Sequence, residues 1–298
     1  MAWLYLCLTI LCFAILGLVC KLGSQRGASS LGLVTMLYST STLASLAWFL
    51  AEGRSITLDA VLLGGGCGLT GCMGFLLFVK SMEIGHYAFS GSIFNSAFLV
   101  STLYAGLFSV AGLSRPQVVG VLLLLGAIFL ITFSGSSSPQ AAQQRKSWGK
   151  WALLIFLAFL FNGVALIFAG EGRDRGVPIS VFLFMLYLSG MVMMIALTVR
   201  GRSARRSTII FGLLAASASF IGNVLSLVCV TLMSYSTVFP ITLSGTVLMA
   251  VMLSLVVLKE RINNIGYVGI ACEIVGIVIV GNEQVFRQAM QHVRAWIG

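Results

Sequence analysis

Charged residues are scarce in this chain. Asp, Glu, Lys and Arg make up 9% of its 298 residues, hydrophobic residues make up 59%, and the mean hydropathy is +1.05. A soluble globular protein carries about 25% charged residues, so this chain has too few to cover a water-facing surface. Its apolar runs of about 20 residues match a hydrocarbon layer of about 30 Å, and the short alternating segments of a barrel are missing. The sequence therefore predicts an all-α polytopic membrane protein.

Several chemical signatures are also missing. The two histidines, His86 and His292, lie outside the predicted spans, and no H-E-x-x-H, G-x-S-x-G or phosphate-loop motif occurs. The seven cysteines lie in apolar runs without a C-x-x-C pair, which is typical of small buried residues. We expect neither an enzyme nor an ATP-driven pump, and neither a cofactor nor a bound metal. The net charge of +10 comes from short loops, so nucleic acid is not an expected partner.

Ten transmembrane helices are predicted from the apolar runs, as two sets of five. The first set is 3–20, 31–50, 58–80, 86–110 and 116–134, and the second is 150–169, 179–199, 208–231, 236–258 and 264–281. We therefore divide the chain into a first repeat (1–134), a polar connecting loop (135–149), a second repeat (150–281) and an amphipathic tail (282–298) that lies in the membrane interface.

The two sets share residues at an offset of 148 or 149 positions. The shared residues are Trp3 and Trp151, Met36-Leu37-Tyr38 and Met185-Leu186-Tyr187, Gly74 and Gly222, and Tyr87 and Tyr235. Such a register indicates duplication. Five is an odd number, so the second copy must enter the bilayer from the opposite side. This inverted repeat is typical of secondary transporters, whose site lies between the halves.

Polar side chains recur at helical spacing inside several spans. Ser92, Asn95 and Ser96 share one face of the span 86–110 and must turn away from lipid. The remaining candidates for a substrate cavity are Tyr87, Asn162, Ser219, Asn223, Ser226, Tyr235, Thr237, Pro240 and Ser244. Each alone could make an interhelical hydrogen bond, but together they favour a cavity between the halves. Pro240 predicts a kink in its span, and the glycines of the span 58–80 predict either close packing or local unwinding.

Three charged residues carry open hypotheses. Glu273 lies near the middle of the span 264–281 and is either a proton-coupling carboxylate or a structural hydrogen bond, within the bundle or at a dimer interface. Lys21 and Lys80 end their spans. Each is either a gate at the mouth of the cavity or a solvated residue near the headgroups.

The end of the ninth span carries a family resemblance. A Pro-containing helix runs into Leu258-Lys259-Glu260-Arg261-Ile262, and a glycine-punctuated helix follows with Gly266, Gly269 and Gly276. With two five-helix copies, this pattern resembles the EamA-type transporters of the drug/metabolite transporter superfamily. The chain departs from the family pattern at Ser114-Arg115-Pro116, where a Glu-Arg pair is expected, and at Phe13-Ala14, where Trp-Gly is usual.

The resemblance implies a carrier in the cell (inner) membrane that moves small organic metabolites or drugs by alternating access, often in export. It implies a cavity surrounded by the third, fourth, eighth and ninth helices, with the first and sixth. It also places both termini in the cytoplasm, whereas a count of Lys and Arg in the loops places them outside. Expected partners are the small solute, the lipid bilayer, and protons or an exchanged solute. A monomer or a homodimer is expected, and a flippase for a lipid-linked carrier is the alternative function.

Overall fold

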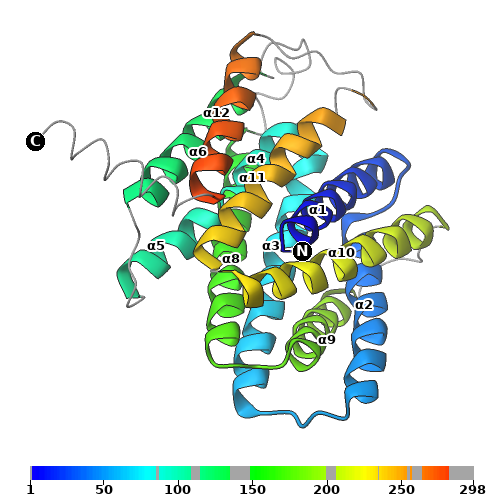
Figure 1. The fold of residues 1–298 in the computed structure, drawn as a ribbon. Helices are drawn as coiled ribbons and strands as arrows, with labels where there is room; N and C mark the ends of the chain where they lie inside the picture. Colours follow the sequence, from blue (N-terminus) through cyan, green and yellow to red (C-terminus); the bar gives the residue numbers. More distant parts are fainter. Residues whose placement is uncertain are drawn as a thin grey trace, which may run out of the picture.

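The computed structural model describes residues 2–84, 87–108, 115–134, 148–198, 206–233, 235–253, 256 and 264–281. The regular elements in these ranges are helices (Figure 1). In chain order they are α1 (Ala2–Gln25), α2 (Ser30–Glu52), η1 (Ala60–Gly64, a π-helical turn), α3 (Gly65–Ile84), α4 (Tyr87–Asn95), α5 (Phe98–Phe108), α6 (Arg115–Ser134), α8 (Trp148–Asp174), α9 (Ile179–Thr198), α10 (Arg206–Leu232), α11 (Tyr235–Leu253) and α12 (Asn264–Gly281).

The described helices confirm an all-α, multi-pass membrane protein. Within these ranges, six segments are long and apolar enough to cross a bilayer: Ala2–Gln25, Ser30–Glu52, Ala60–Ile84, Gly149–Asp174, Ile179–Thr198 and Ser207–Leu232. Shorter apolar segments lie in α6, α11 and α12. The exact tally of ten spans in two repeats stays a prediction. The predicted connecting loop, apart from its last two residues, and the predicted amphipathic tail lie outside the described residues.

Capping residues fix both ends of α2. The Ser29 Oγ accepts a hydrogen bond of 3.2 Å from the Gly32 N–H at the start of α2, and this cap satisfies one of the free donors of the helix. Gly53 ends α2 with a φ of 60°, a left-handed conformation that a glycine adopts without steric cost. The chain therefore turns immediately before and immediately after α2.

The two halves of the chain interlock rather than forming separate bundles. The helix α1 packs against α10, and α8 packs against α3, so the first helix of each half lies on the third helix of the other. The helices α2 and α9 pack together, and so do α6 and α12, which lie side by side in Figure 1. A single large core cluster contains residues from both halves.

Hydrogen bonds at the helix ends fix the directions of the helices. Cys229 Sγ, near the end of α10, donates to the carbonyl oxygen of Ala2 at the start of α1 over 3.8 Å. Trp151 Nε1, near the start of α8, donates to Ser90 Oγ, near the start of α4, over 3.0 Å. Since α4 starts at the end of the bundle where α1 finishes, α1 and α8 run in opposite directions. We call these two ends of the bundle the Ala2 end and the Ser90 end.

The fourth span of the first half is broken, which the sequence did not predict. The helix α4 ends at Asn95 and α5 begins at Phe98. At the break, the Ala97 N–H donates to the Phe94 carbonyl over 3.3 Å, so the helical i to i−4 pattern is interrupted. The kink predicted at Pro240 does not interrupt α11, which is helical from Tyr235 to Leu253. The glycine-rich span is helical too, with a π-helical turn at its start.

Candidate functional site

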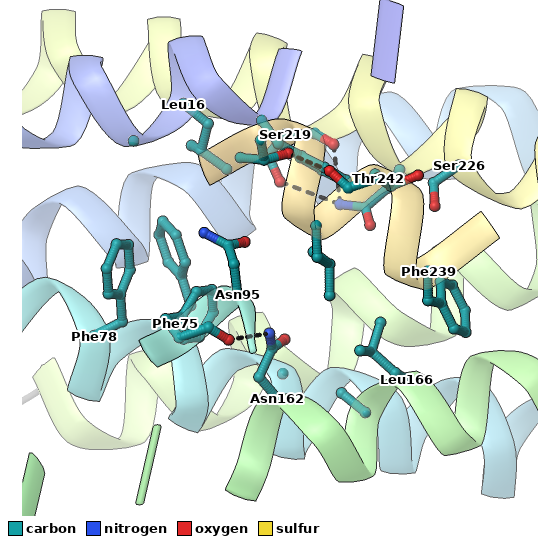
Figure 2. Close-up of a pocket in the computed structure, with 18 of the residues that line it drawn as sticks. Leu16, Phe75, Phe78, Asn95, Asn162, Leu166, Ser219, Ser226, Phe239 and Thr242 are labelled. Carbon is teal, nitrogen blue, oxygen red and sulfur yellow. Dashed lines mark hydrogen bonds between the residues drawn. The ribbon is translucent and has the colours of Figure 1, made fainter. Parts of the chain in front are cut away.

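A cavity of about 180 Å³ lies between the two halves of the chain (Figure 2). Its walls come from α1, α2, α3 and α4 of the first half and from α8, α9, α10 and α11 of the second. The side chains that line it in the described part of the chain are uncharged, and most of them are apolar. Its polar side chains are Tyr38, Ser92, Asn95, Asn162, Tyr187, Ser219, Asn223, Ser226, Thr242 and Thr246.

Two asparagines lie at the break between α4 and α5. Asn95 Nδ2 donates to the Gly91 carbonyl over 2.8 Å, and Asn162 Nδ2, from α8, donates to the Phe94 carbonyl over 3.4 Å. A break in a membrane helix frees backbone groups that must find other partners. The Asn162 amide supplies one from the other half of the chain, and Figure 2 shows this bond.

A second polar cluster joins α9 to α10. Asn223 Nδ2 donates to the Tyr187 hydroxyl oxygen over 3.0 Å and to the Ser219 carbonyl over 3.0 Å. The hydroxyl groups of Tyr187 and Ser219 lie 3.3 Å apart and share a hydrogen bond. These contacts hold three polar side chains in one orientation at the cavity wall.

Aromatic rings form much of the apolar wall. Phe78 of α3 and Phe94 of α4 stack with centroids 4.4 Å apart and an interplanar angle of 12°, and Phe75 lies edge-on to Phe94. Tyr38 of α2 and Tyr187 of α9 meet in a T-shaped pair with centroids 5.8 Å apart. This wall suits a solute with a flat apolar body.

Six of the predicted cavity residues line this cavity together. They are Ser92, Asn95, Asn162, Ser219, Asn223 and Ser226. The side chains of Tyr87 and Tyr235 lie outside the described part of the chain. The neighbouring Ser96 does not line the cavity, because its Oγ donates to the Ser92 carbonyl over 2.8 Å and turns back along the helix.

The predicted face of α11 requires a correction. Thr237, Pro240 and Ser244 do not line the cavity, and the same helix presents Phe239, Thr242, Leu243 and Thr246 to it instead. The helix α11 packs on α1 with Gly245 so close that an added Cβ would lie 2.6 Å from Ile10 Cδ1. This contact sets the rotation of α11. Both faces carry polar residues, so polarity alone did not distinguish them.

None of the charged candidates is found on the described part of the cavity wall. Lys21 and Lys80 are half-buried, and neither lines the cavity. The side chain of Glu273 lies outside the described residues, and its helix α12 supplies none of the cavity lining found in the described chain. Their roles as gates or as a coupling carboxylate stay hypotheses.

Sequence reasoning missed Tyr38, Tyr187, Thr242 and Thr246 as lining residues. The signal for the two tyrosines was present, because they are the third residues of the two Met-Leu-Tyr triplets that recur at the repeat offset. Residues related by a twofold axis meet each other only near that axis. The contact between these two tyrosines is therefore expected at the centre of an inverted repeat.

Comparisons with known proteins agree with this arrangement. Residues 149–282, from α8 to α12, match the model of the EamA-like transporter family. A search of curated proteins finds no match. Among 28 matching chains of solved structures, one described as a crystal structure of a protein superposes with a TM-score of 0.68 over 94% of this chain and 96% of its own, at 15% identity. That identity supports the fold alone. The match over residues 149–282 agrees with the EamA-type resemblance that the sequence predicted.

Proposed function

We propose that this protein is a secondary-active carrier that exports small organic solutes by alternating access. The observation that carries the proposal is a cavity whose wall is drawn from four helices of each half and whose described lining is uncharged. A site shared by two interlocking halves can be exposed to either side of the membrane when the halves rock against each other. The export direction and the inner membrane as its location rest on the family resemblance.

The proposed inverted repeat has support from reciprocal contacts. An added Cβ on Gly74 would lie 3.3 Å from Phe161 Cβ, and an added Cβ on Gly222 would lie 2.8 Å from Phe13 Cε1. Both pairs, Gly74 with Gly222 and Phe13 with Phe161, are separated by the same 148 positions. Duplicated halves of opposite direction produce such matched contacts. We therefore keep the division into repeats 1–134 and 150–281 as part of the proposal.

Polar contacts at both ends of the bundle would have to open in turn. At the Ala2 end, Arg175 Nη1 lies 3.0 Å from Asp59 Oδ1, and the Tyr104 hydroxyl donates to Glu171 Oε1 over 2.9 Å. At the Ser90 end, Trp151 bonds Ser90, and the Thr35 and Thr198 hydroxyl groups lie 3.0 Å apart. Each contact joins one half to the other and is weak enough to break during a transport cycle.

A flippase for a lipid-linked carrier is the alternative function. The cavity volume of about 180 Å³ argues against it, because pockets for drug-sized ligands already measure roughly 300–1,000 Å³. A lipid-linked sugar would need a larger site with a lateral opening. The volume also favours small metabolites over bulky drugs.

The proposal is tested by reconstitution into liposomes. Vesicles loaded with unlabelled solute should take up the same radiolabelled solute by counterflow, and they should need neither ATP nor a membrane potential. Candidate solutes come from a panel of amino acids, amides, nucleobases and drugs, selected by thermal stabilisation of the purified protein. Uptake that equals that of empty liposomes for every stabilising solute would contradict a carrier.

A further inference from the structure

Three asparagines of the cavity wall have carboxamides of known orientation. Their Nδ2 atoms donate to main-chain carbonyls: Asn95 to Gly91, Asn162 to Phe94 and Asn223 to Ser219. A main-chain carbonyl oxygen accepts hydrogen bonds and cannot donate them, so the –NH₂ group of each carboxamide must be the group that faces it.

The opposite atom of each carboxamide is left for the cavity. Within the described chain, none of the three Oδ1 atoms has a hydrogen-bond partner, and none is buried out of reach of a small probe. Figure 2 shows Asn95 and Asn162, from different halves, in the space between their helices. The wall therefore offers three acceptors whose own donors are already used.

Thr242 gives independent support for a missing donor or acceptor. This residue is 1% exposed, it lines the cavity, and its hydroxyl group has no partner in the described chain. Buried hydroxyl groups are almost always hydrogen-bonded, because leaving them unpaired is costly. The Oγ1 atom itself is buried behind the cavity surface, so a solute would pair it once the side chain rotates the hydroxyl group into the cavity.

The rest of the described wall limits the charge of that solute. No charged side chain lines the cavity there, and Phe75, Phe78 and Phe94 form an aromatic surface. A charge moved from water into such a site without a counter-charge is strongly disfavoured. A carboxylate or phosphate would also bring acceptor oxygens against three acceptor oxygens.

We propose, building on the carrier function above, that the solute is a small, flat, uncharged molecule rich in N–H donors. Aromatic carboxamides and nucleobases have this chemistry. Their N–H groups would donate to the Asn95, Asn162 and Asn223 oxygens, and the ring would lie against the phenylalanines. A solute oxygen or nitrogen would pair with the Thr242 hydroxyl after it rotates into the cavity. Organic anions are excluded by this arrangement, and the described wall holds no counter-charge for a protonated amine.

Three probes of nearly identical shape test the proposal by isothermal titration of the purified full-length protein at pH 7. Benzamide is neutral and donates N–H, benzoate is an anion that only accepts, and benzylamine is a cation that donates. We expect benzamide to bind at least tenfold more tightly than the other two. Equal or tighter binding of benzoate would overturn the donor requirement, tighter binding of benzylamine would overturn the uncharged class, and absence of benzamide binding would overturn both.

A pair of variants of α11 separates binding from folding. Thr242→Val removes the unpaired hydroxyl at nearly constant shape, so benzamide affinity should fall about tenfold while the melting temperature of the ligand-free protein stays or rises. Ser244→Ala is the matched control, because Ser244 Oγ is also buried and unpaired but lies off the cavity. Its affinity should equal that of the wild type. Equal affinity losses in both variants, or no loss in Thr242→Val, would overturn the assignment.

A counterflow measurement with the same probes distinguishes this inference from the carrier proposal. Binding of benzamide without counterflow would leave the ligand class standing and remove the carrier. Counterflow of benzoate or benzylamine without that of benzamide would keep the carrier and remove the ligand class. Binding and counterflow of benzamide together support both.

Discussion

The fourth membrane segment of the first half is broken, whereas its counterpart in the second half is continuous. The positions of proline in the sequence suggest the opposite. The first-half helix contains no proline, yet it breaks between Asn95 and Phe98 into α4 and α5. Its counterpart α11 contains Pro240 and stays helical. A break in a membrane depends on whether neighbouring groups satisfy the freed backbone. At the α4 break, the Ala97 N–H and the Asn162 amide both donate to the Phe94 carbonyl, whereas a proline in α11 removes only one donor.

This difference indicates that the broken helix and the unbroken helix have different roles in the site. The broken helix carries one cavity asparagine, Asn95, on a segment that can change its hydrogen bonds, and the unbroken helix supplies a continuous wall from Phe239 to Val251. Discontinuous helices line the sites of many secondary transporters. We expect the α4–α5 break to be the more sensitive of the two elements.

The largest loss of stability is expected where the two halves pack against each other. An added Cβ on Gly68 would lie 2.0 Å from the Leu186 carbonyl oxygen of α9, so Gly68→Leu should destabilise by more than about 4 kcal/mol and abolish the folded protein. Gly65→Leu is the matched control, since no atom lies within 4 Å of its added Cβ. Size-exclusion profiles in detergent measure both. A monodisperse Gly68→Leu protein would contradict the packing.

A smaller loss is expected at the break itself. Asn162→Leu removes one of the two donors to the Phe94 carbonyl and leaves it with only the bond from the Ala97 N–H. We expect a loss of about 1–1.5 kcal/mol of unfolding free energy, together with slower counterflow. Denaturation in a detergent of fixed composition measures the stability. Wild-type stability and wild-type counterflow together would show that the break does not depend on Asn162.

The hydrogen bond between Tyr104 and Glu171, near the end of α5, should contribute less to stability. The Tyr104 hydroxyl donates to Glu171 Oε1 at the Ala2 end, so Tyr104→Phe removes one partly exposed hydrogen bond between the halves. The expected loss is about 0.5–1.5 kcal/mol. A double-mutant cycle with Glu171→Gln isolates the coupling between the two side chains. A coupling indistinguishable from zero would mean that this contact does not hold α5.

Replacing the proline of the unbroken helix should matter little. Pro240→Ala restores one N–H in a helix that is already continuous, so we expect a change in stability below about 1 kcal/mol and counterflow close to the wild-type rate. The same denaturation and counterflow assays apply. A larger effect than that of Asn162→Leu would reverse the comparison and make α11 the moving element.

A substitution in α12 should leave the pH dependence of transport unchanged. No described residue of α12 lines the cavity, so we expect Glu273→Gln to keep the pH dependence of counterflow. This outcome favours the structural interpretation of Glu273. Loss of pH dependence in the variant would assign proton coupling to this carboxyl group instead.

Sequence patterns predicted the class of fold and much of the site, but not the rotation of each helix. Hydropathy located the membrane segments, and helical spacing located Asn95, Asn223 and their serine neighbours. The face of α11 was mispredicted because both of its sides are polar, and contact with Ile10 of α1 chooses between them. The α4–α5 break carries no proline signal, since it depends on an amide from a helix 68 residues away in sequence.

The central claim is that the cavity between the halves opens to each side of the membrane in turn. Ser219→Cys, in a background whose seven native cysteines are replaced by alanine, places one thiol on the cavity wall. Membrane-impermeant maleimide should label it from either side of sealed vesicles, and a transported solute should slow labelling from both. Labelling from one side only, with or without solute, would contradict alternating access.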